Sequence, residues 1–420
     1  MMDQPLRFCM VTTFYPPYNF GGDGIFVHHL SNELARRGHH VEVVHCIDAY
    51  RFLAGKEPAQ SYNDHPNVIT HGLRSPFGFI SPAATQQTGF PWFKSRRLRQ
   101  ILAQGFDVIH YHNMSLLGAS VLKYARGVKL YTAHEYWLVC PTHVLFKFNR
   151  EPCARPSCLS CSIVYKRPPQ WWRYFSLLDG AAKSVDAFLV PSRFSMDKHR
   201  EFGFSGRMVH MPYFISPTES VSPISSPAVR EPLDKNYFLF VGRLEKLKGV
   251  QTLIPLFRRY DKAQLWIAGT GNHENRLRQL ADGSSNIRFL GHLSQAELQP
   301  LYRNAVAVLV PSLWFEVFGL IIIEGFSQRT PAVVRNLGGM AEIIKESGGG
   351  FVYDTEEELV AVMDRLVADP SCRRDLGLRG YEAYRQNWTA EAHLERYFEL
   401  IRERQGAGSR EQGEKRTRRR

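Results

Sequence analysis

Short apolar runs alternate with segments of helical periodicity along most of the chain. After the first run, Phe26, Leu30 and Leu34 recur at helical spacing, and Gly38 follows as a helix stop. The runs that read as buried strands are 8–13, 41–46, 108–111, 128–132, 187–190, 237–241, 265–269, 287–291 and 305–310. Strands that alternate with helices in this way predict an α/β fold with parallel, doubly wound sheets.

The 420 residues are too many for one ordinary core, so two Rossmann-like domains are expected. Four prolines and five serines without periodicity between positions 215 and 233 mark the junction between them. The predicted division is a first domain at 1–215 with an insertion at about 140–175, a linker at 216–235, a second domain at 236–386, a last helix at 387–404, and a basic, disordered tail at 405–420.

The chain is organised around the stretch from 305 to 324. A buried strand ends at Pro311, a loop follows, and a helix is expected to start near Phe318 and Gly319. Glu316 lies in the loop and Glu324 in the apolar helix. Free N–H groups at a helix start attract anions, whereas a buried carboxylate accepts hydrogen bonds from a diol. The stretch therefore suits a ligand such as a nucleotide sugar, although two glutamates alone would also fit solvated charges.

Other candidate site residues follow strand ends, where open α/β sheets bind ligands. Arg243 and Lys248 lie in one loop and could clamp a diphosphate, the arginine bidentately and the lysine as a point charge. Gly21 and Gly22 could let the backbone approach a phosphate, or could simply form a tight turn. His134 is placed for acid–base or hydrogen-bonding work.

These motifs occur in one order between positions 8 and 402, and together they resemble the family-4 retaining glycosyltransferases of the GT-B fold. That family carries a Glu-x7-Glu motif where this chain has Glu316 and Glu324. Its last helix crosses back to the first domain, as 387–404 would here. The family often has Asp where Glu135 follows His134, which leaves the role of this neighbour open.

The resemblance implies a role for each candidate residue. The Gly21-Gly22 loop would approach the donor from the first domain, and backbone near Gly269 and Gly271 would contact the base. Glu324 would hold the ribose, while Glu316 and His134 would position the sugar and the acceptor hydroxyl. The groups that would neutralise the leaving diphosphate are Arg243, Lys248 and the amides near Phe318, Gly319 and Leu320.

The implied reaction is retaining transfer of a hexose-type sugar from a nucleotide-diphosphosugar to a glycan or lipid-linked acceptor, in cell-surface polysaccharide or glycolipid synthesis. Because the sequence has no Asp-x-Asp motif, no cofactor is expected for catalysis. No nucleophile can be identified, so front-face substitution is favoured over a covalent intermediate. A sugar-nucleotide epimerase of the same fold and a non-catalytic partner subunit remain alternatives.

Four of the seven cysteines, Cys140, Cys153, Cys158 and Cys161, fall within 22 residues. They could bind a structural zinc ion, or they could be reduced and partly buried. The odd cysteine count and the absence of a signal-peptide pattern lead us to expect a cytoplasmic enzyme.

The net charge of +13 is unevenly distributed. Residues 1–215 carry 24 Lys and Arg against 14 Asp and Glu, and the last nineteen residues carry 8 against 3. No nucleic-acid-binding signature is present, so nucleic acid is not expected as a partner. A solvated basic face would explain the excess, but we favour peripheral contact with an anionic membrane surface, on the inner face, through 94–99, 166–173 and 415–420.

Overall fold

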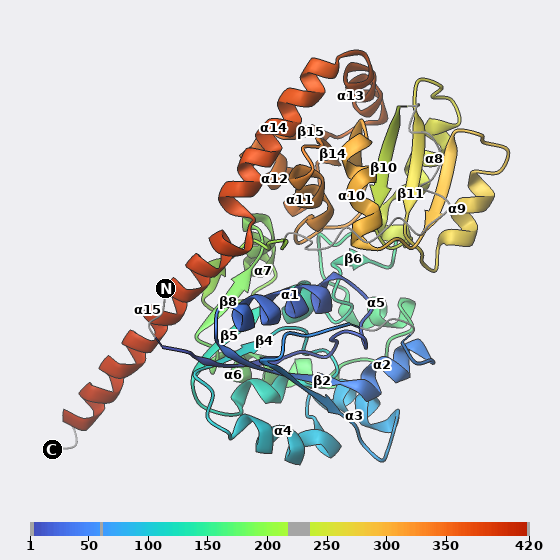
Figure 1. Cartoon of the computed structure of the whole chain (residues 1–420). Helices are drawn as coiled ribbons and strands as arrows, with labels where there is room; N and C mark the ends of the chain where they lie inside the picture. Colours follow the sequence, from blue (N-terminus) through green and yellow to red (C-terminus); the bar gives the residue numbers. More distant parts are fainter. Residues whose placement is uncertain (1–3, 59–61, 217–235, 418–420) are drawn as a thin grey trace.

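The computed structural model describes residues 4–58, 62–216 and 236–417, with side chains described as far as position 407. Two α/β domains lie one above the other, and a long C-terminal helix runs beside the first domain (Figure 1). Apart from Ser216, the predicted linker at 216–235 lies outside the described residues.

The first domain is built on a seven-stranded parallel sheet in the order β3-β2-β1-β4-β5-β8-β9. Its strands are β1 Arg7–Val11, β2 His40–Cys46, β3 Val68–Leu73, β4 Val108–Tyr111, β5 Val128–Thr132, β8 Ala187–Val190 and β9 Met208–His210. The predicted strands are therefore confirmed within one or two residues. The strands β3 and β9 were not foreseen because they lie at the two edges of the sheet and are only partly buried.

Helices cover both faces of this sheet (Figure 1). They are α1 Gly22–Arg36, α2 Ile47–Ala54, α3 Ile80–Thr88, α4 Ser95–Leu102, α6 Leu177–Ala182 and α7 Arg193–Glu201. The insertion between β5 and α6 contains a hairpin and one helix, namely β6 Phe146–Lys147, β7 Glu151–Pro152 and α5 Cys158–Val164. Short 3-10 turns complete the domain: η1 Trp92–Lys94, η2 Ala119–Lys123, η3 Tyr136–Leu138 and η4 Trp171–Phe175.

The apolar character of the strands follows from burial on both faces. In β1, Phe8 and Met10 pack in one core with the helical stripe of α1, while Cys9 and Val11 pack in another core with α4. Successive strand residues point to opposite faces, so most positions of a central strand are apolar. A continuous apolar run, rather than an alternating one, is the result.

The second domain repeats the plan with six parallel strands in the order β12-β11-β10-β13-β14-β15. The strands are β10 Tyr237–Val241, β11 Gln264–Ala268, β12 Ile287–Gly291, β13 Ala307–Val310, β14 Ala332–Arg335 and β15 Gly350–Tyr353. Its helices are η6 Lys246–Lys248, α8 Val250–Phe257, α9 Glu274–Leu280, α10 Gln295–Asn304, α11 Leu320–Ser327, α12 Gly339–Ser347, α13 Glu356–Ala368 and α14 Pro370–Asn387. The two doubly wound domains confirm the predicted fold class.

The C-terminal part differs from the prediction. The expected helix at 387–404 is divided at the buried Trp388, where α14 ends, and α15, Ala390–Thr417, begins two residues later. The chain expected to be disordered from 405 is helical as far as Thr417, because its Glu, Arg and Gln residues extend a helix that is already anchored. Residues 418–420 lie outside the described residues.

The chain passes between the domains at two places that lie side by side. Ile215, on the outgoing connection, pairs with Thr389 on the returning one, and the Ile215 N–H donates to the Trp388 carbonyl at 3.2 Å. Beyond this point α15 packs on the first domain, where the Tyr397 hydroxyl lies 2.9 Å from His110 Nδ1 beneath Phe8.

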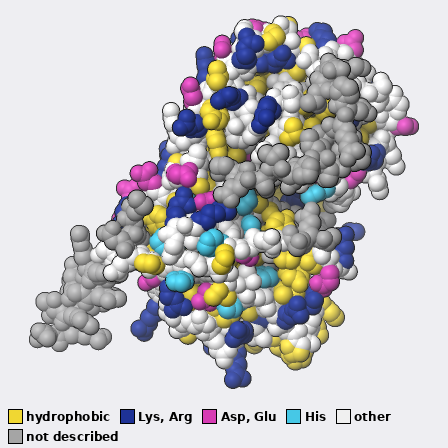
Figure 2. Space-filling model, viewed as in Figure 1, with side chains coloured by type: hydrophobic (Ala, Val, Ile, Leu, Met, Phe, Trp, Pro, Cys, Tyr) yellow, Lys and Arg dark blue, Asp and Glu magenta, His cyan; other side chains and the backbone are white. Residues whose placement is uncertain are grey.

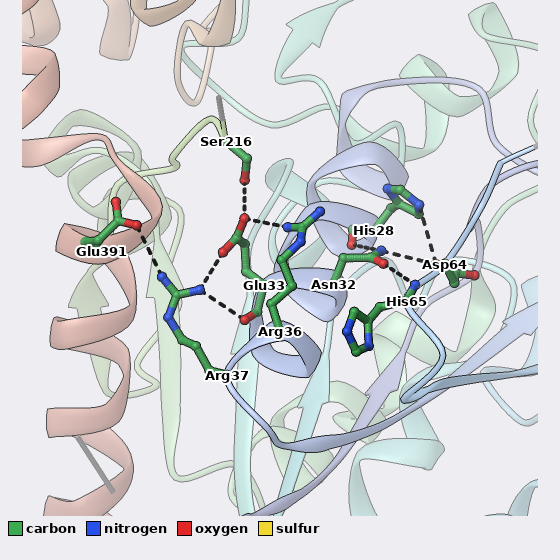
Figure 3. Close-up of polar contacts among 9 residues, drawn as sticks. All are labelled: His28, Asn32, Glu33, Arg36, Arg37, Asp64, His65, Ser216 and Glu391. Carbon is green, nitrogen blue, oxygen red and sulfur yellow. Dashed lines mark hydrogen bonds and ion pairs between the residues drawn. The ribbon is translucent and has the colours of Figure 1, made fainter. Parts of the chain in front are cut away.

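A cluster of charges on α1 holds both connections (Figure 3). Glu33 accepts hydrogen bonds from Arg36 at 2.7 Å, from Arg37, and from the Ser216 hydroxyl at 2.9 Å. Arg37 reaches on to Glu391 of α15 at 3.4 Å. Burial alone would raise the pKa of Glu33, but its arginine and serine partners hold the pKa below the usual value. The carboxylate therefore stays ionised and attached to both connections.

Candidate active site

The order of strands reverses between β1 and β4 in the first sheet and between β10 and β13 in the second. Open α/β sheets bind ligands at the carboxyl ends of the strands beside such a reversal. The loops at these ends are 12–21 and 112–118 in the first domain, and 242–249 and 311–319 in the second. Gly21, Gly22, Arg243, Lys248, Glu316, Phe318, Gly319 and Leu320 of the predicted site lie in or next to these loops.

Glu316 and Lys248 form an ion pair between the two loops of the second domain. Lys248 Nζ lies 2.6 Å from Glu316 Oε1, and the Ser312 hydroxyl donates to the same oxygen at 2.8 Å. Glu316 is buried, with 7% of its surface exposed. The structure thus brings together the carboxylate and the lysine that the sequence places 68 residues apart.

Close backbone contact holds these loops in place. Gly249 has a φ of +80°, and a Cβ on it would lie 1.9 Å from the Pro311 carbonyl oxygen. The Leu313 N–H donates to the Leu247 carbonyl at 2.8 Å across the same contact. Only glycine satisfies both the left-handed backbone and the missing space. The turn that carries Lys248 is therefore pressed onto the loop that carries Glu316.

Gly269 and Gly271 lie at the end of β11, behind the loop that carries Arg243. A Cβ on Gly269, whose φ is +135°, would lie 1.9 Å from the Gly242 carbonyl oxygen, and a Cβ on Gly271 would lie 2.4 Å from that of Leu244. The structure thus gives both glycines a supporting position under the Arg243 loop. Their predicted contact with the base stays a prediction.

The two domains meet at Gly21 and Gly22. A Cβ on Gly21 would lie 3.7 Å from Arg243 Nε, and one on Gly22 would lie 3.4 Å from Leu320 Cδ1. Arg243 itself pairs with Glu245 at 2.7 Å, with more than half of its side chain exposed. The helix α1 begins at Gly22, so Gly21 is the residue before the first helical turn.

Glu324 lies one turn into α11, on the other side of the same helix start. Its Oε2 accepts a hydrogen bond from the Tyr302 hydroxyl at 2.6 Å. Burial raises the pKa of Glu324, and the hydrogen bond from Tyr302 opposes that rise. Within the described residues its other oxygen accepts no hydrogen bond, so it is free to accept one from a ligand hydroxyl.

The start of α11 is packed against the first domain. Phe318 is buried, and its ring meets the edge of Tyr213 at 5.3 Å between centroids. Gly319 precedes the helix, and a Cβ there would lie 2.5 Å from Ile322 Cδ1. The amides of Leu320 and the next residue open the helix and are not bonded within a preceding turn. An anion at this point would meet the positive end of α11.

A second contact joins the domains behind Glu316. The Gly339 N–H, at the start of α12, donates to the Glu316 carbonyl at 2.7 Å. Three residues on, the carboxylate of Glu342 accepts the N–H groups of Arg193 and Phe194, each at 2.9 Å, in the first turn of α7. Helix α12 therefore contacts the backbone of Glu316 in the second domain and the first turn of α7 in the first domain.

His134 has partners on both ring nitrogens. Nε2 lies 3.0 Å from His112 Nδ1, and Nδ1 lies 2.6 Å from the Tyr213 hydroxyl. Burial lowers the pKa of His134 to about 3, against a weak opposing effect of Glu135. The imidazole is therefore neutral at neutral pH, which suits hydrogen bonding and does not suit general-acid catalysis. Its predicted place beside the acceptor stays a prediction.

The sequence reading missed several polar groups on the first-domain side. Asp23 accepts a hydrogen bond from Asn113 at 3.0 Å, and its pKa is raised by burial and then by the charge of Glu135. Glu135 in turn pairs with His143 at 2.9 Å. Asp23 directly follows the two glycines, so its position in the first turn of a glycine-led helix was the available signal. Asn113 is brought in only by the topology of β4.

The four clustered cysteines lie in the insertion that follows β5, and Cys140 and Cys153 pack in one buried cluster with Trp314 and Val317 of the second domain. Among the residues that the structure describes, no group of three or more His, Cys, Asp or Glu side chains is arranged to hold a metal ion as it stands. The side chains that the structure places at the second-domain reversal are Lys248, Glu316 and Ser312, beside the start of α11.

Two Rossmann-like domains that face each other, with an ion pair and a helix start at the junction, define the GT-B class of fold. Two family models match consecutive parts of the chain: Glycosyltransferase Family 4 at 20–219 and Glycosyl transferases group 1 at 222–383. The chain belongs to the family-4 glycosyltransferases of the GT-B fold, which confirms the resemblance seen in the sequence. It is a glycosyltransferase.

Individual relatives agree with this assignment. The O-antigen chain mannosyltransferase C of Escherichia coli is 25% identical over 406 residues, covering 94% of this chain and 98% of the relative. Among solved structures, a sucrose-phosphate synthase from Thermosynechococcus elongatus has a TM-score of 0.73 at 20% identity, covering 96% of this chain and 100% of that one. HepE from Anabaena, solved with UDP and glucose, has a TM-score of 0.67 at 16% identity and covers 95% and 100%.

Buried histidines predict sensitivity to acid. Burial lowers the pKa of His45, His199 and His393 to about 4. An unfolded histidine titrates near pKa 6.5, so below about pH 6.5 the unfolded chain binds protons that the folded chain does not. Stability should be full above that pH and fall as the pH drops toward about 4. Urea unfolding at about pH 7.5 and pH 5 would measure the decrease.

A variant pair gives the control for this prediction. Replacing the buried His199 with glutamine should flatten the decrease, whereas His40→Gln, at an exposed position, should not change it. The same decrease in unfolding free energy between the two pH values for wild type and His199→Gln would contradict the explanation.

Proposed function

We propose that this glycosyltransferase moves a hexose from a nucleotide-diphosphosugar to an acceptor hydroxyl with retention of configuration. The observation that supports the proposal most is the buried Lys248–Glu316 pair beside the start of α11. It sets a cation, a carboxylate and free backbone amides around one point, where the strand order reverses. A diphosphate with a sugar attached has complementary charge and hydrogen-bonding groups.

In the proposed reaction, the bond between the sugar's anomeric carbon and the diphosphate oxygen breaks while a bond to the acceptor oxygen forms. Negative charge grows on the leaving nucleoside diphosphate. Lys248, Arg243 and the first amides of α11 would stabilise that charge. The acceptor's proton would pass to the leaving phosphate oxygen on the same face, so no protein nucleophile is needed. Glu324, with one free carboxylate oxygen, would accept hydrogen bonds from the ribose.

The likeness to named proteins supports a donor and an acceptor class. HepE was solved with UDP and glucose, and the Escherichia coli relative is a mannosyltransferase of the O-antigen chain. We propose a nucleoside-diphosphate hexose as donor and a growing glycan or lipid-linked sugar of cell-surface polysaccharide as acceptor. An epimerase would act without an acceptor, and a non-catalytic subunit would have no need of the Lys248–Glu316 pair, so neither alternative is favoured.

Loss of either member of the ion pair should abolish transfer. Glu316→Gln keeps the shape of the side chain and Lys248→Ala removes the cation, and each should lower kcat/KM by roughly 100- to 1000-fold because a charge partner of the transition state is lost. The measurement is transfer of radiolabelled sugar from a panel of nucleotide sugars, the accepted donor being the one that raises the Tm of the wild-type chain.

The matched control is Lys262→Ala, which removes an exposed lysine paired with Asp364 in the same domain. It should keep full activity, and far-UV circular dichroism should show that all three variants are folded. Turnover near the wild-type rate in folded Glu316→Gln and Lys248→Ala would rule out this site as the catalytic one.

Transfer should not require an added divalent cation, because protein cations and amides meet the diphosphate. Brief treatment with EDTA should leave the initial rate within about twofold of the untreated enzyme. The bound metal content should be measured in the same samples, so that loss of a structural ion is not mistaken for loss of a catalytic one. An EDTA-treated enzyme that is inactive and regains its rate with manganese alone would contradict this part of the proposal.

We further propose that the enzyme binds its acceptor at a membrane surface. None of the helices in the described residues is both long enough and apolar enough to cross a membrane. The first domain, however, exposes a group of large apolar side chains on neighbouring short helices. They are Phe52 and Leu53 of α2, Phe77, Phe79 and Ile80 before and at α3, Phe90, Trp92 and Phe93 around η1, and Trp171, Tyr174 and Phe175 of η4.

These segments are connected in space. The ring of Phe77 lies 4.4 Å from that of Phe93, and the indole N–H of Trp172 in η4 donates to the Gln86 carbonyl of α3 at 2.9 Å. Figure 2 shows hydrophobic side chains gathered over α2 and α3, at the lower right, beside Lys and Arg. Aromatic rings with basic neighbours are typical of surfaces that lie on an anionic membrane.

The structure changes which basic residues can take part. Arg96, Arg97 and Arg99 are exposed, but Lys94 is buried and donates to the Ser81 hydroxyl, so it is removed from the predicted set. Arg173 is also turned inward, onto the Trp137 carbonyl at 2.6 Å. Burial of these two side chains was not visible in a run of basic residues. Side chains at 415–420 are outside the described residues.

Binding to anionic vesicles should depend on this aromatic group. The wild-type chain should sediment with anionic vesicles at low salt and be released at high salt, because each nearby Lys or Arg contributes about 1 kcal/mol of screened attraction. Trp92→Ala with Phe93→Ala should weaken binding, whereas Leu378→Ala, an exposed leucine of the second domain, should not. Equal, negligible sedimentation with anionic and neutral vesicles at low salt would exclude membrane contact.

A further inference from the structure

The insertion between β5 and α6 arranges its four cysteines around a small β-hairpin and a helix. Cys140 precedes the hairpin β6–β7, Cys153 directly follows β7, and Cys158 and Cys161 lie in the first two turns of α5. Two cysteines in the loops that flank a hairpin and two at the start of a helix bring four ligands from separate chain segments to one place. The spacing of the last pair, C-x2-C, allows both sulfurs to face the same point.

All four cysteines line one small cavity. The volume of the cavity is ≈ 20 Å³, which is room for about one water molecule. Most of the remaining wall is apolar, formed by Val139, Pro141, Leu145, Phe146, Pro156 and Phe202. Cys140, Cys153 and Cys161 are buried, and Cys158 is partly exposed. A cavity of this size, walled by sulfur and carbon, suits a soft metal ion better than a polar ligand.

The backbone of the insertion gives a physical reason for a cross-link. Five of its residues other than glycine have a left-handed backbone: His143, Leu145, Phe148, Asn149 and Lys166. Such conformations persist only where the surroundings hold them, and the hairpin has just two residues in each strand. A short hairpin and a seven-residue helix are too small to supply that restraint by their own packing.

Three of the four sulfur atoms have hydrogen-bond partners within the insertion. The Phe148 N–H, at the turn of the hairpin, donates to Cys161 Sγ at 3.4 Å. Cys140 Sγ lies 3.2 Å from the Thr142 hydroxyl, and Cys153 Sγ donates to the Arg155 carbonyl at 3.6 Å. These partners are atoms of the insertion itself, and the described residues show no group of three or more side chains already arranged to hold a metal ion. An ion in the cavity would replace those weak contacts with bonds to sulfur.

Basic side chains lie beside the cavity and would balance the charge of a metal centre formed by thiolates. Four thiolates and one divalent ion carry a net charge of about −2. Lys147 lines the cavity, and Arg173 lines the adjoining hollow together with Cys158. In the described chain Arg173 forms hydrogen bonds with the Trp137 carbonyl and with Gln170, and it forms no ion pair with a carboxylate. A buried guanidinium without an anionic partner fits a nearby anionic centre.

From this arrangement we propose that Cys140, Cys153, Cys158 and Cys161 bind one Zn²⁺ ion in a structural, four-thiolate site. Four cysteine ligands leave no open position for water or substrate, so the ion would not take part in transfer. Its role would be to fix the fold of the insertion.

The insertion in turn forms part of the junction between the domains. Tyr136 and Phe146 pack in one buried cluster with Trp314 and Val317, the residues that flank Glu316 in the second domain. Lys246 Nζ also donates to the Asn149 carbonyl of the hairpin turn at 3.0 Å. The zinc site would therefore support a wall of the active site from the first domain.

The test is the metal content of the full chain, purified without chelator and measured by inductively coupled plasma mass spectrometry. We expect about one zinc per chain. Cys158→Ser and Cys161→Ser should each reduce that content at least tenfold. The matched control is Cys372→Ser, a partly exposed cysteine in α14 of the second domain, which should keep the zinc. Zinc below a tenth of an equivalent in the wild-type chain, or zinc that survives Cys158→Ser with Cys161→Ser, would overturn the proposal.

A second measurement uses the wild-type chain alone, in case the variants do not fold. Chain produced with cobalt in place of zinc should show the charge-transfer and d–d absorption bands of tetrahedral cobalt bound to four thiolates. Absence of these bands from a folded, cobalt-loaded chain, or the presence of iron with the visible absorption of an iron–sulfur cluster, would reject the zinc site. None of these readouts depends on transferase activity, so they are independent of the proposed reaction.

Discussion

The buried ion pair between Lys248 and Glu316 is the interaction on which the arrangement of the site depends. Glu316 is buried, and a buried carboxylate is costly unless a cation and hydrogen-bond donors contact it, as Lys248 and Ser312 both do here. The two loops must therefore stay in contact, which is possible only because Gly249 has no side chain. The glycines at 242, 269 and 271 support the next loop in the same way, so the Arg243 loop takes its position from backbone packing.

Several buried strands, and the polar residues that follow them, could be predicted from the sequence for a physical reason. A strand buried on both faces is a continuous apolar run, and its end is followed at once by polar site residues, so β4, β5, β8 and β10 and the residues after β1, β10 and β13 could be read directly. Partners that come together only through topology could not be read in this way. Asn113 meets Asp23, and Tyr213 meets both His134 and Phe318, only after the sheets are assembled.

Burial of charged and aromatic side chains was the other feature that the sequence concealed. The composition of the basic run at 94–99 does not show whether Lys94 points inward. In the structure Lys94 does point inward, and its amino group donates a hydrogen bond to the hydroxyl of Ser81 in α3. The exposed rings around α3 and η1 likewise read as possible core residues until the helices are placed. At the C-terminus, the high helix propensity of Glu, Arg and Gln extended α15 through a stretch whose composition indicated disorder.

The pairing of Ile215 with Thr389 also sets how the two domains can move. Because the chain crosses between the two domains at two adjacent points, the domains can rotate about one axis that passes through those points. Rotation about that axis would hardly change the distances among the charged residues around Glu33. It would increase the distances between parts of the two domains that lie farther from the axis. The contacts that such a rotation would break include those of the Glu342 carboxylate with α7, the Lys246–Asn149 hydrogen bond and the packing of Tyr213 on Phe318. Opening would therefore widen the gap between Gly21 and Arg243, the place where a donor would enter and the spent nucleotide would leave.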